Sequence, residues 1–338
     1  MSPSKSSETV PTRPWSAWPL RLALAALVAA VPLVFFGGSV TTLHAGLAID
    51  GWWILEPGRG DWFLWAYPIE QWFRDVGTFV EHSHRLFGTL VGLLCIAAVV
   101  ASFAVRAGRL SKDMALAALG GVIAQGVLGG LRVIDKSSDL AFVHGAVGQA
   151  VFALLGASAL VHARPWSMAL GQPTRQVHAL RRTALWTTAL VYVQIFLGAW
   201  LRHGQSQAAL VAHLVFLMVA LWGSMRLLRD LRRCAEESAI GALERRIFVR
   251  LRRALAIALV LQVLLGVLAF LTVYVIIGRH PSDVSQALFP TLHVLGGATL
   301  LLACVASVLW AQRLVQRVPQ DELAHGGLPS RASLGAAR

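Results

Sequence analysis

The sequence predicts an all-α polytopic membrane protein whose eight transmembrane helices form two pseudo-symmetric four-helix bundles. Of its 338 residues, 56% are hydrophobic and only 14% are charged, a composition too apolar for soluble domains. The apolar residues fall into runs of about twenty, the length that crosses a bilayer. The distribution of arginine between these runs and an internal repeat then predict the orientation and the two bundles.

The chain begins with a polar segment, residues 1–19, that we expect to lie in the cytoplasm. The apolar run that follows at 20–43 is longer than the core of a signal peptide, so it predicts an uncleaved first helix. The next segment, 45–78, combines five tryptophans with acidic residues, which is typical of a non-cytoplasmic loop at headgroup level. Seven further spans are predicted at 83–105, 114–133, 141–163, 183–202, 208–226, 254–278 and 288–311.

Arginine and lysine are concentrated in every second connection between the spans. The connections after the second, fourth and sixth spans carry them at positions 106, 109, 112, 164, 175, 181 and 182 and at nine positions between 226 and 253. The positive-inside rule therefore predicts a multi-pass protein of the cell (inner or plasma) membrane with both termini in the cytoplasm. The same clustering accounts for the net charge of +13, so we do not expect nucleic-acid binding.

A motif of the form Gln-x-x-Leu-Gly recurs in the third, fifth and seventh spans, at 125–129, 194–198 and 262–266. Its glycine allows a neighbouring helix or a flat macrocycle to approach the backbone closely. A histidine follows in the next span each time, so the repeating unit is a helical hairpin, and two hairpins make one half of the protein. The predicted organisation is a first half at 20–163, a cytoplasmic linker at 164–182, a second half at 183–312 and a poorly ordered cytoplasmic tail at 313–338.

Four histidines lie in the outer parts of the even-numbered spans, one in each. An imidazole in hydrocarbon needs a partner, and histidines from facing helices of a bundle bind haem iron from both sides in many proteins. The repeat pairs His84 with His144 and His213 with His293, which predicts two iron sites. For any single histidine the alternative is a hydrogen-bonded core residue. Two others, His44 and His82, stay unassigned, and the remaining five are expected to be loop or interfacial residues, namely His162, His178, His203, His280 and His325.

Glu81 opens the second span and, on a helix, shares a face with His84 and Arg85 at i+3 and i+4. No acid precedes His213 in the same way, so we expect the chemistry at the first pair, with Glu81 as the catalytic residue. The alternative for Glu81 is a surface ion pair with Arg85. Arg85, Arg132 and Arg202 all stand at outer ends of spans, where they suit either haem propionates or lipid headgroups.

Together these features resemble the haem A synthase family of terminal-oxidase biogenesis, over about residues 20–312. The resemblance rests on the eight spans, Glu-x-x-His-Arg at 81–85, the three Gln-x-x-Leu-Gly motifs and the four histidines. It implies a membrane-bound oxidoreductase that oxidises the C8 methyl of haem O to a formyl group, giving haem A. It further implies that His84 and His144 bind haem O as substrate, that His213 and His293 bind haem b as cofactor, and that Glu81 is needed for turnover.

The sequence departs from the family pattern in two places. The loop 45–78 lacks the cysteine pair found in many bacterial members, and Thr41 and Thr42 stand where an arginine usually follows the glycine pair of the first helix. The expected partners are a haem O synthase, an unidentified electron donor and the bilayer, with a homo-oligomer left open. The alternative functions are a dihaem b-type electron carrier, disfavoured because all four histidines lie toward one side, and a transporter with histidine proton relays.

Overall fold

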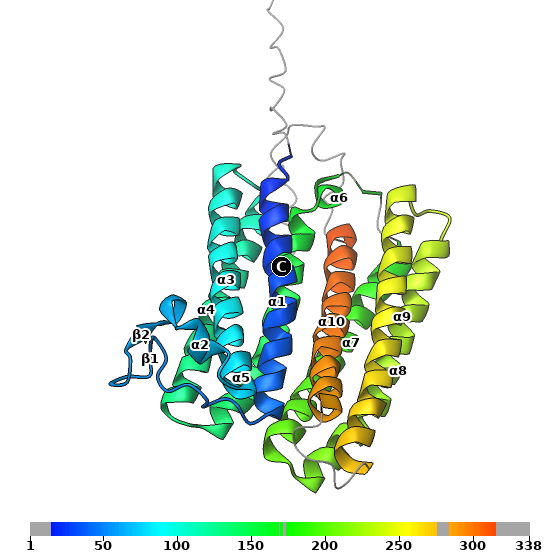
Figure 1. Cartoon of the computed structure of the whole chain (residues 1–338). Coiled ribbons are helices and arrows are strands. Elements are labelled where there is room, and N and C mark those ends of the chain that lie inside the picture. Colours follow the sequence, from blue (N-terminus) through cyan, green and yellow to red (C-terminus); the bar gives the residue numbers. More distant parts are fainter. Residues whose placement is uncertain (1–14, 169, 172–173, 276–283, 316–338) are drawn as a thin grey trace, which may run out of the picture.

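The structure is a computed structural model that describes residues 15–168, 170–171, 174–275 and 284–315. This part of the chain contains eight helices long and apolar enough to cross a membrane, which confirms the predicted spans (Figure 1). The helices are α1 (Trp18–Thr42), α3 (Val76–Ala104), α4 (Arg109–Ile134), α5 (Ser138–His162), α7 (Arg175–Gly204), α8 (Gln207–Glu236), α9 (Ala242–Phe270) and α10 (Val284–Val315). A π-helical turn, η2 (Leu271–Val275), continues α9.

Several helices are longer than the apolar runs that predicted them. Helix α3 begins at Val76 rather than at residue 83, and α7 begins at Arg175, inside the expected linker, which also holds the short helix α6 (Arg164–Ser167). The starts coincide with side-chain caps, because Asp75 and Thr174 accept hydrogen bonds from backbone N–H groups of the first turns. Hydropathy therefore marks the part of a helix that lies in lipid, whereas the caps mark where the helix begins.

Some of the expected segments lie partly outside the described residues, two at the ends of the chain and one within it. This applies to positions 1–14 of the N-terminal segment, to positions 316–338 of the tail, and to positions 276–278 of the seventh span. Within the described part, α10 continues to Val315, past the expected end of the second half at residue 312.

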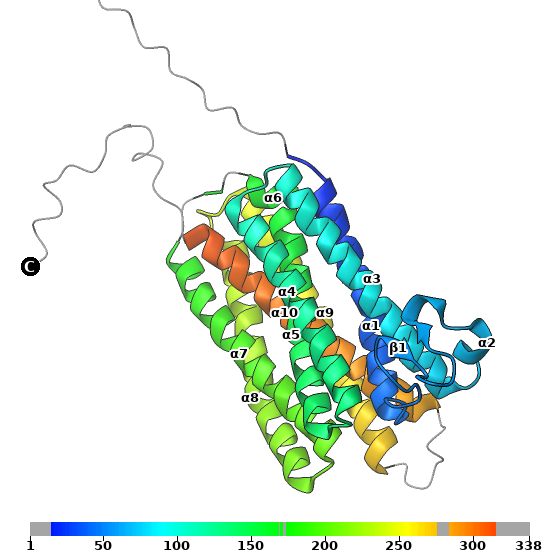
Figure 2. The same cartoon turned by 90° about the vertical axis from the view of Figure 1, so that its left-hand side faces the viewer.

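The helices pack as two rings of four. Helices α1, α3, α4 and α5 contact one another in cyclic order, and so do α7, α8, α9 and α10. The two rings meet through α1, α5, α7 and α10 (Figures 1 and 2). Each of these four helices thus packs against helices of both rings, which places the outer ends of the two bundles side by side.

The loop between α1 and α3 folds into a small unit of its own. Strand β1 (Ile54–Leu55) pairs antiparallel with β2 (Trp62–Phe63), and η1 (Leu64–Ala66) and α2 (Ile69–Trp72) follow. Its core contains Ile49, Leu55 and Tyr67, all buried. Figure 2 shows this unit beside the end of α3. The predicted loop is therefore an ordered cap on one end of the first bundle, which we call the outer cap (residues 45–75).

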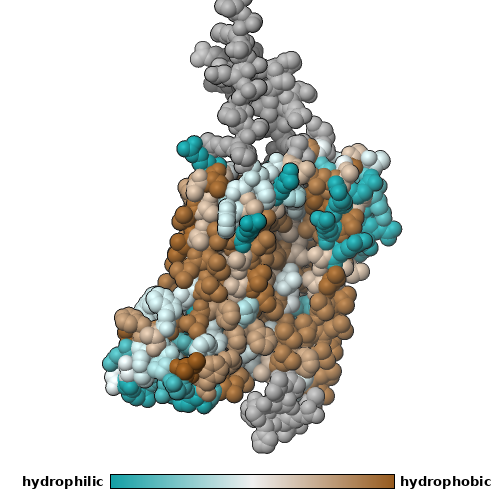
Figure 3. Space-filling model, turned by 45° about the horizontal axis from the view of Figure 1, so that its top comes forward, coloured by the Kyte–Doolittle hydropathy of each residue, from teal (hydrophilic) through white to brown (hydrophobic). Residues whose placement is uncertain are grey.

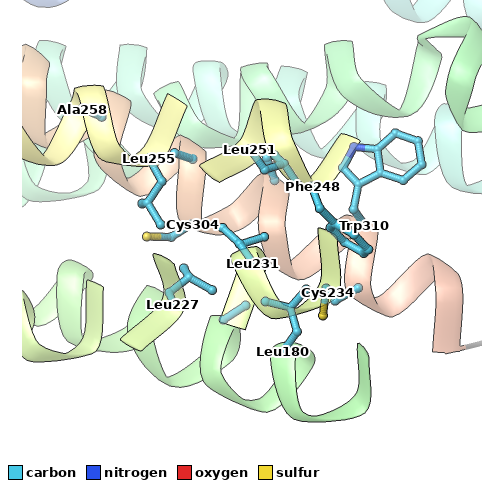
Figure 4. Close-up of a cluster of buried hydrophobic side chains, with 14 of the residues drawn as sticks. Leu180, Leu227, Leu231, Cys234, Phe248, Leu251, Leu255, Ala258, Cys304 and Trp310 are labelled. Carbon is cyan, nitrogen blue, oxygen red and sulfur yellow. The ribbon is translucent and has the colours of Figure 1, made fainter. Parts of the chain in front are cut away.

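Figure 3 shows a broad apolar band between polar regions at the two ends of the molecule. One polar region is the outer cap, and the other is the arginine-rich end where α8 is followed by α9. The inner part of the second bundle is packed with large side chains, among them Leu227, Leu231, Phe248 and Leu255 (Figure 4).

Asp75 caps the N-terminus of α3, the helix that carries Glu81 and His84. Its carboxylate accepts hydrogen bonds from the backbone N–H and from the hydroxyl of Thr78, at 2.8 and 2.9 Å. The backbone N–H of Thr78 lowers the pKa of Asp75 below its ordinary value. The pKa of Asp75 is therefore lower in the folded protein than in the unfolded chain. The stabilisation of the fold by the ionised Asp75 is fully present above the pKa of the unfolded chain, and it is lost as the pH falls through the pKa of the folded protein.

We expect Asp75→Ala to destabilise the protein by about 1 kcal/mol at neutral pH, the usual cost of losing such a cap. Asp75→Asn is the matched variant, because asparagine caps a helix as well as aspartate does but does not titrate. Thermal unfolding in detergent at neutral and acidic pH measures both effects. Equal decreases of the unfolding temperature in Asp75→Ala and Asp75→Asn at neutral pH would contradict a capping role.

Candidate functional site

The structure brings the four intramembrane histidines together as two pairs. His84 on α3 faces His144 on α5, with ring centres 6.2 Å apart and the ring planes at 83°. His213 on α8 faces His293 on α10, with ring centres 6.4 Å apart and the planes at 84°. The pairs are those that the repeat predicts, and their geometries are nearly the same.

These distances suit two imidazoles that bind one iron ion from opposite sides. With metal–nitrogen bonds of about 2 Å on each side, the ring centres of two such ligands lie roughly 6 Å apart. No group of three or more histidine, cysteine or acidic side chains that could hold a metal occurs in the described residues. Two imidazoles alone suit a metal whose other ligands come from a macrocycle, so the donor set fits haem better than zinc.

Each histidine packs against a glycine of a neighbouring helix in its own bundle. A Cβ atom placed on Gly37 of α1 would lie 2.7 Å from Cε1 of His84, and one on Gly129 of α4 would lie 3.2 Å from Cε1 of His144. In the second bundle, Gly198 and Gly266 lie equally close to His213 and His293. The last glycine of each Gln-x-x-Leu-Gly motif therefore makes room for an imidazole ring, and Gly37 does the same on α1.

Backbone carbonyl groups orient two of the imidazoles, one in each pair. Nδ1 of His84 lies 3.0 Å from the carbonyl oxygen of Leu33, and Nδ1 of His293 lies 3.2 Å from that of Gln262. A hydrogen bond from Nδ1–H to a carbonyl leaves the lone pair on Nε2, the arrangement common among metal-binding histidines. In His293 this Nε2 lies 3.3 Å from the side-chain amide nitrogen of Gln262. The carbonyl in each bond belongs to the residue four positions before the packed glycine, Gly37 or Gly266.

We expect Gly129→Val to reduce haem bound at the first pair severely, because the branched side chain would occupy the space of the His144 ring. Gly126→Val is the matched control on the same helix, since a Cβ atom there meets nothing within 4 Å. Absorbance spectra of the two purified variants, loaded with haem O, measure the effect. Equal haem loss in both variants would show that the packing of Gly129 on His144 is not what matters.

Glu81 is buried beside the first pair, with 3% of its surface exposed. One carboxylate oxygen accepts a hydrogen bond from Arg85 at 2.7 Å, and the other accepts one from the backbone N–H of Ile49 at 3.0 Å. The ion pair between Glu81 and Arg85 thus exists, but it is buried rather than on the surface. Two donors from different elements fix the orientation of the carboxylate one helical turn from His84.

Arginines at the outer ends of α3 and α4 bind the outer cap. Arg85 donates hydrogen bonds to the carbonyl oxygens of Gly51 and Ile49, and Arg132 donates one to that of Gly46 at 2.7 Å. Trp52 lies against Gly130 of α4, where a Cβ atom would lie 2.2 Å from the indole ring. The outer cap is therefore fastened over the helices that carry the first histidine pair.

A comparison with protein-family models finds a match over more than half of the chain. The model is described as cytochrome oxidase assembly protein (COX15-CtaA), and it matches residues 20–225. The chain belongs to this family. The matched region includes Glu81 and three of the four histidines, all except His293. A search of curated protein sequences gives no match.

The third outer arginine, Arg202 on α7, connects the two bundles of this member of the cytochrome oxidase assembly family. Its guanidinium donates to the carbonyl oxygen of Gly38 and the hydroxyl of Thr42 on α1, both at 2.6 Å, and to the carbonyl oxygen of Pro290 on α10 at 3.4 Å. Thr42 is one of the threonines at the end of the first helix, where a family arginine was expected. The cation at this level is supplied by α7 instead.

Two histidines differ from the sequence-based expectations for this family member. His162 is buried rather than interfacial, because its ring nitrogens lie 2.7 Å from the carbonyl oxygen of Ser158 and 2.9 Å from the hydroxyl of Ser102. His82, which the sequence left unassigned, is buried against the rings of Tyr67 and Trp72 in the outer cap. Neither position could be read from hydropathy, since both depend on helices or loops distant in the sequence.

Proposed function

We propose that this protein is a haem A synthase, which oxidises the C8 methyl group of haem O to a formyl group in two successive oxidations and so supplies haem A to terminal oxidases. Membership of the cytochrome oxidase assembly family supports the proposal. The observation that carries it is an asymmetry between two similar sites. Both bundles hold a facing histidine pair, but only His84 has a buried carboxylate, Glu81, one turn away.

The second pair is the proposed cofactor site. His213 and His293 would hold haem b, and the hydrogen bond from Nδ1 of His293 to the carbonyl oxygen of Gln262 favours the tautomer that leaves Nε2 as the metal-binding nitrogen. When bound, haem b supplies one-electron transfer. The same cyclic helix order and the same glycine contact in both bundles support a pseudo-symmetric duplication, in which one copy keeps the cofactor and the other receives the substrate.

The first pair is the proposed substrate site. His84 and His144 hold haem O beneath the outer cap, which excludes water from the reacting carbon. Each oxidation would replace one C–H bond of the methyl carbon with a C–O bond and remove two electrons from that carbon, giving an alcohol and then a geminal diol; the diol then loses water to leave the formyl group. Glu81 either relays protons released at each oxidation or stabilises positive charge on the reacting carbon, and its two hydrogen bonds hold it ready for either role.

The outer arginines are the proposed partners of the haem propionates. Arg132 and Arg202 are partly or largely buried, and in the described part of the chain their hydrogen bonds go to backbone carbonyls and a hydroxyl rather than to carboxylates. A buried cation without an anion is costly in a membrane, so an anionic ligand stabilises it. Arg85 is already paired with Glu81, so its contact with a propionate would be shared with that carboxylate.

The arginine-rich end of the molecule is the proposed cytoplasmic side. The positive-inside rule then places both termini in the cytoplasm and the outer cap on the opposite face of the cell membrane. A haem O synthase and an electron donor are the proposed partners of this protein.

Co-expression with a haem O synthase in a host that makes no haem A tests the proposal. Haems extracted from the membranes are separated by chromatography, and we expect haem A only where this chain is present. A stable haem b protein that leaves haem O unchanged would overturn the synthase assignment in favour of an electron carrier. A purified protein without haem would favour a transporter.

A further inference from the structure

An open surface cavity with charged side chains in its lining lies at the arginine-rich end, far from the histidine pairs. It has a volume of about 290 Å³ and lies between the first turns of α7 and the last turns of α8. Three arginines, one aspartate and two uncharged residues line it, namely Arg175, Gln176, Ala179, Arg226, Asp230 and Arg233. Nothing in the proposed haem chemistry uses this cavity.

The cavity is strongly positive. Its one acid, Asp230, is buried and is shared between Arg226 at 3.2 Å and Arg233 at 3.6 Å, and it also accepts a hydrogen bond from Thr183 at 2.8 Å. Within the lining, one carboxylate therefore offsets one of the three arginines, which leaves about two positive charges. A further acid, Glu237, lies outside the lining at the start of α7, where it accepts a hydrogen bond from the hydroxyl of Thr174 at 2.6 Å. The N-terminus of α7, a helix of 30 residues, adds the positive end of its dipole at Arg175.

Asp230 also holds two of the arginine side chains in place. Arg226 and Arg233 bind it from positions four residues before and three residues after on the same helix. Their outer sides stay accessible, since 46% and 62% of their side-chain surfaces are exposed. The arginines are thus positioned in advance for an anion that each can bind through two N–H groups.

The helix faces below the cavity are apolar and exposed. On α8, Trp222 and Val219 lie one and two turns before Arg226 on the same face, with 64% and 41% of their surfaces exposed. On α7, Trp186 lies two turns after Ala179 and is 73% exposed. A cationic cavity above an apolar face matches a molecule with an anionic head and hydrocarbon chains.

We propose that this cavity is a binding site for an anionic phospholipid, with the phosphate held by Arg175, Arg226 and Arg233 and the acyl chains lying over Trp222 and Trp186. The arginines bind the phosphate group, and a lipid headgroup and a free phosphate ion both carry such a group. The apolar face that continues from the cavity favours the lipid. This site is independent of the proposed haem A synthase activity.

The test uses the full-length protein, purified in a neutral detergent and mixed with phosphatidylglycerol, cardiolipin or phosphatidylcholine. We expect the two anionic lipids to raise the midpoint temperature of unfolding more than phosphatidylcholine does. In the double variant Arg175→Gln/Arg233→Gln, the lipid concentration needed for half of this shift should rise about 25-fold, because each arginine near a headgroup contributes about fivefold in affinity. This variant keeps the pair between Arg226 and Asp230, so the bundle stays supported.

The matched control is the double variant Arg245→Gln/Arg246→Gln, which removes the same charge from the same end of the molecule but from exposed residues of α9 outside the cavity. It should respond to lipid as the wild type does. An equal loss in the control, or equal shifts with phosphatidylcholine, would overturn the site in favour of general surface charge. If inorganic phosphate alone reproduces the shift, the ligand is a free phosphate and the lipid assignment is wrong.

Discussion

A Glu81→Gln variant is expected to retain its haem b and to bind haem O, yet to produce almost no haem A. Glutamine has nearly the same shape and can still accept the hydrogen bond from Ile49 N–H, so the outer cap keeps this contact. It carries no negative charge, so it cannot accept a proton or stabilise a developing cation. The removal of such a group lowers turnover by roughly 100-fold to 10,000-fold.

The measurement is the ratio of haem A to haem O extracted from cells that co-express a haem O synthase, together with the haem O that co-purifies with the variant. Glu70→Gln is the control, because Glu70 is an exposed acid of α2 in the same outer cap. Haem O that stays bound but unconverted would support a chemical role for Glu81. Haem A at the wild-type level would refute it, and loss of bound haem O would instead assign Glu81 to holding the cap over the site.

The second large effect is expected from the two histidine pairs, which should respond differently to alanine substitution. His213→Ala or His293→Ala should remove nearly all resident haem b, because the remaining imidazole provides a single axial ligand. His84→Ala should leave haem b in place and abolish the conversion of haem O. The two pairs lie in different bundles, so each substitution is expected to act on its own site.

Reduced-minus-oxidised absorbance spectra and haem extraction distinguish these outcomes in the purified variants. His178→Ala serves as the control, since His178 is exposed near the start of α7. Circular dichroism shows whether each variant keeps its helices. If His84→Ala lost the resident haem while His213→Ala kept it, the assignment of cofactor and substrate sites would be reversed.

The sequence by itself determined the eight spans and the pairing of the histidines. Every backbone N–H and C=O in lipid must be paired within its own segment, so an apolar run of sufficient length has to be a helix. The Gln-x-x-Leu-Gly repeat places His144, His213 and His293 at a similar depth in their hairpins, and His84 holds the corresponding place in the first hairpin, which is enough to pair His84 with His144 and His213 with His293. These features depend only on local composition and periodicity.

The tertiary structure alone decided which groups surround those histidines. Glu81 meets the backbone of Ile49, Arg202 crosses to Gly38 of the other bundle, and His162 is buried against Ser102. Each contact joins residues 32 or more positions apart in the chain. Such contacts depend on how the helices pack and on where the outer cap lies, and neither periodicity nor hydropathy specifies these. The reason is physical, because a buried polar group takes whichever partner the packing brings within reach.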